Sequence, residues 1–267
     1  MILTADSGST KTTWVAGEQR FLTQGINPFH MTEEQMRNII NSELLTLDDF
    51  PQPSLFSEIH FYGAGCTTEK APILEELLHE TFSKASTIKV GSDMLGAARA
   101  LFGNKEGIAC ILGTGANSCM YDGECITDNV SPMGYILGDE GSGAVIGRTF
   151  LNALYKGEHR DFIPVFERET GLSLPDIIER VYRQPMPNRF LASLAPFIKA
   201  HIEEEWLEQM VVEAFRLFFQ HNVRHYHRTD LPCSFVGSIA YYFEEQLRKA
   251  AEMEGYFIGE IKKEPLE

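Results

Sequence analysis

The sequence predicts an α/β fold made of two halves of similar design. Each half opens with an apolar strand, a loop of small residues and a second apolar strand, first over residues 2–16 and again over 108–126. Helices and strands then alternate, as in an α/β domain, and the recurrence indicates duplication. We place the boundary in the Gly/Asn/Lys loop near residue 105, which gives segments 1–105 and 106–267.

Apolar runs bounded by turn residues predict the strands of the first half, and helical periodicity predicts its helices. The best-marked helix begins after Thr32, an N-cap residue with Gln35 three positions later in a capping box. The expected strands cover residues 2–5, 13–16, 20–25, 58–65 and 86–93. The expected helices cover residues 32–45, 71–82 and 94–103.

The second half repeats the strand–loop–strand unit and then becomes mostly helical. "SCMYDGECI" is predicted as a strand that turns at Asp122 and Gly123, a typical hairpin pair. Residues 233–255 are predicted as a strand, a Gly-Ser turn and a helix. The other expected helices lie near residues 140–154, 175–183, 190–200 and 203–222.

Composition and charge exclude several classes of function. Of the 267 residues, 43% are hydrophobic and 23% are charged, which is ordinary for a globular chain. The net charge of −15 lacks the basic surface that nucleic acids and anionic membranes require. No run approaches the roughly 18 apolar residues of a membrane span, and the N-terminus lacks the pattern of a secretory signal. We therefore expect a cytoplasmic protein without nucleic-acid or membrane partners.

Neither the cysteines nor the histidine cluster predicts a metal centre. The odd number of cysteines, without a C-x-x-C pair, argues against a disulfide framework and a zinc ribbon, so free thiols are expected. Histidines four residues apart on a helix can bind a metal, but no acidic ligand is placed beside His221 and His225, which favours a solvated helix end. The cysteines are Cys66, Cys110, Cys119, Cys125 and Cys233.

The first small-residue loop, "DSGSTKT" at residues 6–12, has features of a phosphate site. It is not a Walker A loop, since Thr10 stands where that motif needs its second glycine. The N–H and hydroxyl groups of a Gly-Ser-Thr turn can still bind a phosphate, and Asp6 at the strand end could hold Mg²⁺ through water. A polar hairpin turn without a ligand explains the same residues.

Two further loops of this kind follow. "GTGANS" at residues 113–118 has Ser118 where a dinucleotide-binding motif has its last glycine, and a strand follows it where that motif needs a helix. A second phosphate loop or a tight turn therefore remains. The third loop, at Gly237 and Ser238, joins a strand to a helix; a glycine there lets a ligand approach the backbone, although an ordinary turn explains it equally well.

The order and spacing of the three loops, with the acidic strand end first, resemble the actin, Hsp70 and sugar-kinase superfamily, from residue 2 to about 245. In that superfamily the loops are two phosphate hairpins and an adenosine turn. "SDMLGAARAL", "CILGTGANSCMYDG", "GYILGDEGSGAVIG" and "FVGSIAYYF" resemble the N-acetylglucosamine kinase group of the BadF/BadG-type ATPase family. The resemblance implies two duplicated actin-like ATPase (ribonuclease H-like) lobes with a cleft between them.

The resemblance also implies catalytic and nucleotide-binding residues. Phosphoryl transfer needs a group that accepts the proton of the attacking hydroxyl, and Asp93, at a strand-to-helix junction, matches the family's aspartate. Capping of the helix by Ser92 or Asp93 is the structural alternative, and it predicts no loss of catalysis on mutation. The implied cofactors are ATP and Mg²⁺, with Asp6 at the metal. The implied nucleotide-side residues are Asp6, Gly8, Ser9, Thr10, Lys11, Gly113, Thr114, Gly115, Gly237 and Ser238.

The sugar contacts follow from the same resemblance. Asp139 has an alternative role as the helix N-cap, and Glu140 could assist the metal or favour the helix N-terminus. Met133 departs from the family, since animal amino-sugar kinases have a tryptophan there, and methionine is less selective for shape. The implied substrate contacts are Asn27, Asp93, Asn117, Gly134 and Asp139.

The implied function is an ATP-dependent kinase that phosphorylates an amino sugar, N-acetylglucosamine in the first place, as two lobes close over ATP and sugar. A muramic acid kinase would share this chemistry. One alternative is an ATPase that activates a partner redox enzyme, of the 2-hydroxyacyl-CoA dehydratase activator type, which needs a close cysteine pair for an iron–sulfur cluster. Another is a non-catalytic ATP-binding sugar sensor. The expected partners are the sugar and ATP, and a homodimer is common in the family.

Overall fold

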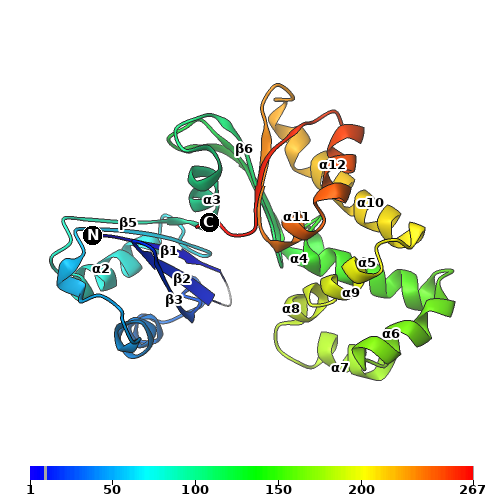
Figure 1. Cartoon of the computed structure of the whole chain (residues 1–267), viewed down its shortest axis with the longest axis horizontal. Coiled ribbons are helices and arrows are strands. Elements are labelled where there is room, and N and C mark those ends of the chain that lie inside the picture. The colour runs from blue at the N-terminus through cyan, green and yellow to red at the C-terminus, as the bar shows by residue number, and fades with distance from the viewer. Residues whose placement is uncertain (9–10, 267) are drawn as a thin grey trace. The chain divides into compact units, whose positions relative to one another are not determined.

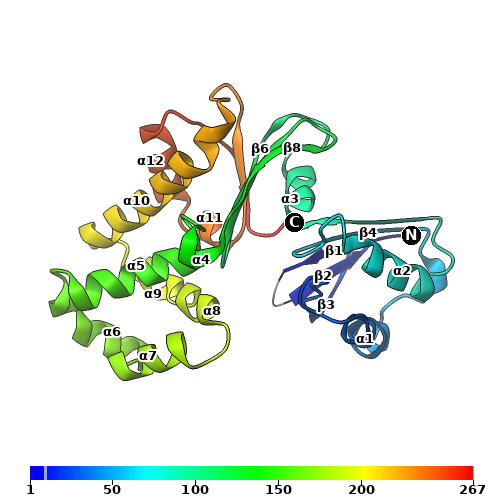
Figure 2. The same cartoon turned by 180° about the vertical axis from the view of Figure 1, so that it is seen from behind.

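The computed structural model of the chain describes residues 1–8 and 11–266 (Figures 1 and 2). The chain divides into two compact units. Unit 1 consists of Met1–Ala100 together with Leu266, and unit 2 consists of Leu101–Pro265.

Unit 1 is built on a five-stranded mixed sheet with the strand order β3-β2-β1-β4-β5. β1, β2 and β3 are antiparallel neighbours, whereas β4 runs parallel to β1 and β5 parallel to β4. Because side chains alternate along β1, Ala5 and Ser7 face the core while Asp6 faces the other side of the sheet. The strands are β1 (Ile2–Ser7), β2 (Lys11–Ala16), β3 (Gln19–Gln24), β4 (Glu58–Gly63) and β5 (Thr87–Ser92).

The helices of unit 1 are α1 (Glu33–Asn38), α2 (Ala71–Thr81) and α3 (Asp93–Phe102), the last of which ends in unit 2. The predicted capping box is confirmed, with Thr32 and Gln35 bonded reciprocally. The continuous helix predicted over residues 32–45 is wrong. A π-helical turn (Ile39–Glu43) and a 3₁₀ turn (Leu44–Thr46) follow α1. The wider turn adds a residue per turn, and the adjacent Ile39 and Ile40 are both buried.

Unit 2 repeats the sheet of unit 1. Its strand order is β8-β7-β6-β9-β10, with β6, β7 and β8 antiparallel and β9 and β10 parallel to β6, so the predicted duplication in an α/β fold is confirmed. β10 was not predicted, because Glu260 and Lys262 interrupt any apolar run in it and its side chains are at most half-buried. The strands are β6 (Gly107–Leu112), β7 (Ala116–Tyr121), β8 (Ile126–Val130), β9 (Cys233–Val236) and β10 (Ile258–Lys262).

Helices make up most of the rest of unit 2, and α10 and α12 lie side by side in both views (Figures 1 and 2). The single helix predicted near residues 190–200 is two helices, because Pro196 starts a new one in its first turn. The helix predicted up to residue 255 is likewise interrupted, at Phe243. The helices are α4 (Gly134–Leu137), α5 (Gly143–Lys156), α6 (Ile163–Thr170), α7 (Leu174–Tyr182), α8 (Pro187–Ala192), α9 (Ala195–Ala200), α10 (Glu205–His221), α11 (Ser238–Tyr242) and α12 (Glu244–Met253).

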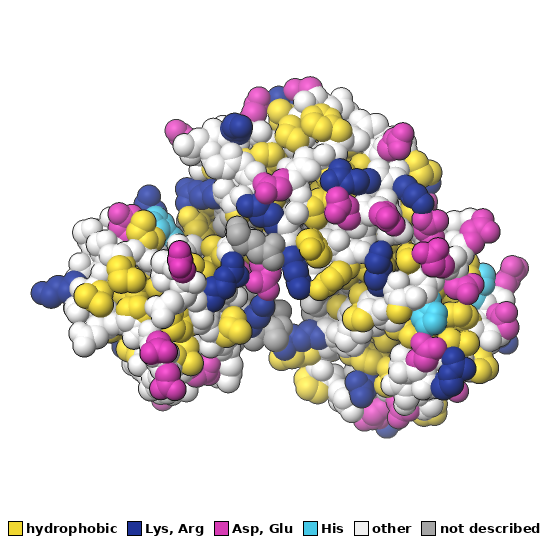
Figure 3. All heavy atoms as spheres, in the orientation of Figure 1, with side chains coloured by type: hydrophobic (Ala, Val, Ile, Leu, Met, Phe, Trp, Pro, Cys, Tyr) yellow, Lys and Arg dark blue, Asp and Glu magenta, His cyan; other side chains and the backbone are white. Residues whose placement is uncertain are grey.

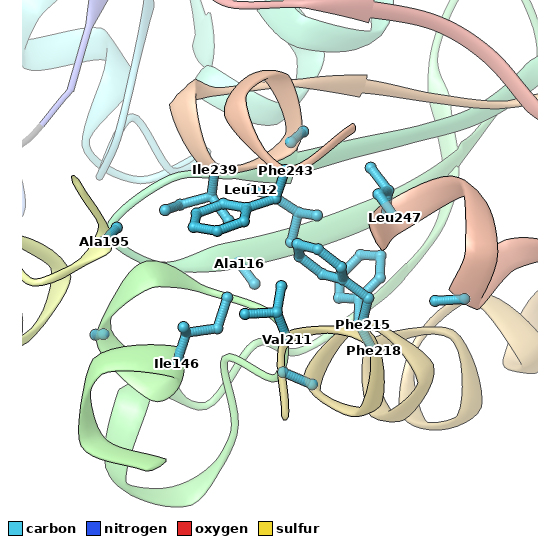
Figure 4. Close-up of a cluster of buried hydrophobic side chains, with 14 of the residues drawn as sticks. Leu112, Ala116, Ile146, Ala195, Val211, Phe215, Phe218, Ile239, Phe243 and Leu247 are labelled. Carbon is cyan, nitrogen blue, oxygen red and sulfur yellow. The ribbon is translucent and has the colours of Figure 1, made fainter. Parts of the chain in front are cut away.

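The core of unit 2 holds α5, α10, α11 and α12 against the sheet. Figure 4 shows Leu112 of β6, Ile146 of α5, Phe215 of α10 and Phe243 meeting in this cluster, and each is fully or almost fully buried. Since α5 and α11 begin next to the strand ends, this packing fixes where the loops before them lie. Acidic side chains are spread over the helical part of unit 2 on the face shown in Figure 3, as the net charge leads one to expect.

Candidate functional site

The carboxyl ends of three strands of unit 1 lie in one row. Ser7, Gly63 and Ser92, the last residues of β1, β4 and β5, are paired in register. Asp6 lies one position back in β1, paired with Tyr62. Parallel strands place their carboxyl ends at one edge of the sheet, where α/β proteins bind their ligands.

Asp93 follows this row directly and begins α3. Its Oδ1 accepts a hydrogen bond from the Met94 N–H (2.8 Å), while Ser92 Oγ accepts one from the Leu95 N–H (3.2 Å). Burial raises the pKa of Asp93, and the hydrogen bonds from the Met94 and Asp93 N–H groups oppose this rise. Both capping contacts named as the alternative are therefore present, yet Ser92 alone supplies the usual N-cap bond. A half-buried carboxyl with a raised pKa suits a proton acceptor.

Cys66 lies beside Asp93. The thiol is buried, and burial first and the Asp93 carboxylate second raise its pKa to about 12. The thiol is therefore neutral near this carboxyl group and adds no charge there.

The phosphate hairpin predicted at residues 6–12 joins β1 to β2. The Gly8 N–H donates to the Lys11 carbonyl (3.0 Å), which closes the turn. Asp6 is half-buried and Lys11 is exposed. Ser9 and Thr10 were also predicted to contact phosphate, and both lie outside the described residues.

Asn27 is held in a defined orientation after β3. Its Oδ1 accepts a hydrogen bond from the Phe29 N–H (2.9 Å), and its carbonyl accepts from the N–H groups of His30 and Met31. Gly65, with φ of +77°, lies directly against it: a Cβ at Gly65 would come within 2.0 Å of Asn27 Oδ1. Oδ1 has a second lone pair and the amide nitrogen has two N–H donors, so both ends of the Asn27 amide can hydrogen-bond a ligand hydroxyl.

In unit 2 the second hairpin rests on the start of α5. The N–H groups of Gly143 and Ala144 donate to the carbonyls of Gly113 (2.8 Å) and Thr114 (3.1 Å). These are first-turn donors of a helix, which have no partner within it. A Cβ at Gly143 would press on the Ala192 and Ile239 side chains at 3.1 Å, so a glycine is needed for this close approach.

Asp139 reaches the same hairpin from the other side. Its carboxylate accepts a hydrogen bond from the Ala116 N–H, and a Cβ at Gly115 would lie 3.1 Å from its Oδ2. Burial raises the pKa of Asp139 to about 6, and the charge of Glu140 adds to this rise. The alternative in which Asp139 caps α5 is wrong: the cap is Ser142, whose Oγ accepts from the Val145 N–H (3.2 Å). The Asp139 side chain therefore contacts the hairpin and does not cap the helix.

Glu140 contacts the end of α10, which the sequence did not reveal. His221 Nδ1 lies 3.0 Å from Glu140 Oε1, and Asn222 Nδ2 lies 3.5 Å from Oε2. Burial alone would raise the pKa of Glu140, but these hydrogen bonds outweigh it and lower the pKa. His221 is exposed at the end of α10, as predicted, and its ring also contacts the loop that carries Asp139. His225 pairs instead with Asp128 (3.2 Å).

The two other predicted sugar contacts of unit 2 lie on different elements, Asn117 in β7 and Gly134 at the start of α4. Asn117 Oδ1 accepts hydrogen bonds from the Ser118 N–H and from Asn129 Nδ2 (both 2.9 Å), which leaves its amide nitrogen to face a ligand. Gly134 (φ +73°) begins α4 directly after the left-handed Met133. Met133 is 59% exposed and therefore accessible.

The third loop requires its glycine. Gly237 has φ of +127°, and a Cβ there would lie 2.2 Å from the Leu112 carbonyl at the end of β6. Its N–H donates to the Lys262 carbonyl (3.0 Å), and Ser238 begins α11. Gly113 and Gly237 thus follow the adjacent ends of β6 and β9. Unit 2 therefore brings Gly113, Gly115, Asp139 and Gly237 to one edge of its sheet.

The described residues contain no helix long and apolar enough to cross a membrane, and no group of three or more His, Cys, Asp or Glu side chains arranged to hold a metal ion. Three of the free cysteines lie on strands of unit 2, and burial raises the pKa of each thiol. They pack as small apolar side chains. They are Cys110, Cys119 and Cys233.

The chain matches no protein-family model and no curated protein. Among solved structures, a "putative N-acetylglucosamine kinase" from Porphyromonas gingivalis is 46% identical, with a TM-score of 0.93, over 100% of this chain and 96% of that one. A protein of the same description from Chromobacterium violaceum is 17% identical, with a TM-score of 0.70, over 96% and 93% of the two chains.

A ROK family glucokinase from Streptomyces griseus, solved with glucose and AMPPNP, is 14% identical, with a TM-score of 0.54, over 97% of this chain and 93% of that one. The likeness to this protein and to that from Chromobacterium concerns the fold, whereas the 46% identity to the Porphyromonas protein extends over the full chain. The predicted resemblance is thereby confirmed: this chain belongs to the N-acetylglucosamine kinase-like group of sugar kinases with the actin-like ATPase fold.

Proposed function

We propose that this protein transfers the γ-phosphoryl group of Mg-ATP to a hydroxyl of N-acetylglucosamine. The observation that carries the proposal is the full-length likeness, at 46% identity, to the Porphyromonas protein that bears this description. The local geometry agrees with it. Two small-residue hairpins and a glycine turn follow the ends of three strands, and a carboxyl with a raised pKa follows a fourth strand.

In this proposal Asp93 accepts the proton of the sugar hydroxyl. Its raised pKa brings it closer to the operating pH, which favours proton transfer. The nearby Cys66 thiol stays neutral and does not compete for the proton. Asn27, Asn117, Gly134 and Asp139 bind the sugar, with amide nitrogens donating to hydroxyl oxygens and the Asp139 carboxylate accepting from a hydroxyl.

The nucleotide is bound by backbone in this proposal. Thr114 and the flanking glycines of the second hairpin approach the phosphates closely because no side chain intervenes at residues 113 and 115. In the first hairpin Gly8 likewise has no side chain in the way of a phosphate, and Lys11 contributes its positive charge. Gly237 and Ser238 hold the adenosine. Asp6 suits Mg²⁺, which prefers one or two carboxylates together with water and phosphate oxygens. The metal ion supplies charge neutralisation at the phosphates.

The test is ADP release from Mg-ATP with a panel of sugars under air: N-acetylglucosamine, glucosamine, N-acetylmuramic acid, N-acetylmannosamine and glucose. ADP release that depends on N-acetylglucosamine supports the proposal. Release that depends on N-acetylmuramic acid instead would indicate a muramic acid kinase. Slow release that no sugar changes would move the assignment to an ATPase activator or a sensor.

A further inference from the structure

A buried cluster of hydroxyl groups joins the first hairpin to the loop that carries Asn27. Ser7 and Thr12 are both fully buried, and their hydroxyl oxygens lie 2.7 Å apart. The Ile26 N–H donates to Ser7 Oγ (2.9 Å) and lies 3.2 Å from Thr12 Oγ1. The two hydroxyl protons have three acceptors within reach: the other hydroxyl, the Ile26 carbonyl (2.9 Å from Ser7 Oγ) and the Gln24 carbonyl (3.0 Å from Thr12 Oγ1). Both backbone groups of Ile26 thus depend on side chains of the hairpin.

The members of this cluster are neighbours of the proposed ligand contacts. Ser7 follows Asp6, Thr12 follows Lys11, and Ile26 precedes Asn27. The side chains come from the two strands that flank the hairpin, whereas the backbone groups come from the end of β3 and the loop after it. In surroundings that exclude water, losing one partner leaves the other unsatisfied, so such a cluster holds its parts in one arrangement.

Ser7 also fixes the loop on the other side of Asn27. Its carbonyl accepts a hydrogen bond from the Ala64 N–H (3.0 Å), at the start of the turn that contains Gly65. That turn lies against the Asn27 amide, because Gly65 has no side chain to separate them. Ser7 therefore holds both segments that position Asn27. One is Ile26, which precedes Asn27, and the other is the turn with Gly65, which lies against the Asn27 amide.

We propose that Ser7 and Thr12 are positioning residues that couple the nucleotide hairpin to Asn27, so that nucleotide bound at the hairpin tightens sugar binding. This inference rests on the proposed function. A ligand that holds Ser7 and Thr12 in place also holds Ile26, and by linkage the sugar must tighten nucleotide binding by the same factor. The coupling lies entirely within unit 1.

The experiment measures the sugar Kd by calorimetry with and without saturating AMPPNP, together with the KM values for sugar and ATP. For the wild-type protein we expect AMPPNP to tighten sugar binding by about fivefold or more. In Thr12→Val, which keeps the shape but loses the hydroxyl, the two sugar Kd values should become equal within about twofold. The sugar KM should rise by about tenfold, the equivalent of roughly 1.4 kcal/mol, on the scale of one hydrogen bond. Ser7→Ala should behave in the same way.

Two variants separate positioning from general stability. Thr23 is buried and paired in register with Thr12, and its Oγ1 accepts from Trp14 Nε1 (3.0 Å). Thr23 Oγ1 also donates to the Gln24 carbonyl (3.0 Å), the acceptor that Thr12 uses. Thr23→Val therefore removes comparable buried hydrogen bonds, while both backbone groups of Ile26 keep their partners. It should lower the melting temperature about as much as Thr12→Val does and leave the coupling at the wild-type value. Thr12→Ser restores the hydroxyl and should restore the coupling.

The outcomes distinguish the two proposals. A wild-type protein that binds and phosphorylates none of the sugars overturns the proposed function, and this inference with it. Wild-type turnover together with unchanged coupling in Thr12→Val and Ser7→Ala overturns this inference alone, as does an equal loss of coupling in Thr23→Val.

Discussion

The carboxylate of Asp139 lies directly over Gly115, so closely that a Cβ on Gly115 would stand 3.1 Å from Asp139 Oδ2. The Ala116 N–H next to it donates to the same carboxylate. Asp139, which we propose binds the sugar, thus rests on the hairpin at residues 113–118, which we propose binds phosphate. This close contact is possible because Gly115 has no Cβ.

We expect Gly115→Ala to raise the sugar KM by about three- to tenfold, because the new methyl group displaces Asp139 by a few tenths of an ångström. Steady-state kinetics with varied sugar at saturating ATP measures this change. The control is a double-mutant cycle with Asp139→Ala: once the carboxylate is removed, Gly115→Ala should have little further effect on the sugar KM. Additive effects would show that the methyl group acts elsewhere.

Stability should depend on pH through Asp139. Its folded pKa of about 6 lies above the value of about 3.9 for an unfolded aspartate. The folded state therefore holds the proton more tightly, so this contribution to stability is fully present below pH 4 and is lost as pH rises through 6. Asp139→Asn removes the titrating carboxyl group, so this part of the pH dependence of stability should disappear.

Urea unfolding at pH 4.5 and 7 checks this prediction in both proteins. The gain in unfolding free energy from Asp139→Asn should be larger at pH 7 than at pH 4.5. An equal gain at both pH values would contradict the raised pKa.

The parts of this site that sequence could predict are those with a local steric cause. Gly115 and Gly237 stand in small-residue loops because the Asp139 carboxylate and the Leu112 backbone, respectively, lie where a side chain would be, and such loops are visible in a sequence. Asp93 is visible because it sits between an apolar strand and a helix that Ser92 can cap.

The parts that sequence missed are contacts between distant segments. Glu140 and His221 are 81 residues apart, and Ser7 and Ile26 are 19 apart. Nothing in the periodicity around either member indicates its partner, since the pairing is set by how α10 and β3 pack. For the same reason His221 and His225 look alike in the sequence, although only His221 contacts the loop of Asp139.

Gly237→Ala should lower the unfolding free energy by more than about 2 kcal/mol, because the turn has a backbone conformation open almost only to glycine and a Cβ would meet the Leu112 carbonyl at 2.2 Å. Gly255→Ala is the matched control. It also has a positive φ (+78°) but nothing within 4 Å of the Cβ, so it should cost about 1 kcal/mol. Urea unfolding of both variants gives the comparison, and equal losses would mean that the contact with Leu112 does not matter.

Asp93→Asn should fold and lose turnover. Ser92 Oγ still caps α3, and asparagine keeps an oxygen for the Met94 N–H, so the melting temperature should change little. The amide cannot accept the hydroxyl proton, so kcat should fall by about 100-fold or more while the sugar KM changes little. Ser92→Ala should do the opposite, lowering stability by about 1 kcal/mol while turnover persists. If Asp93→Asn retains kcat and instead unfolds at lower temperature, Asp93 is a cap, and the proton acceptor must be sought among other groups.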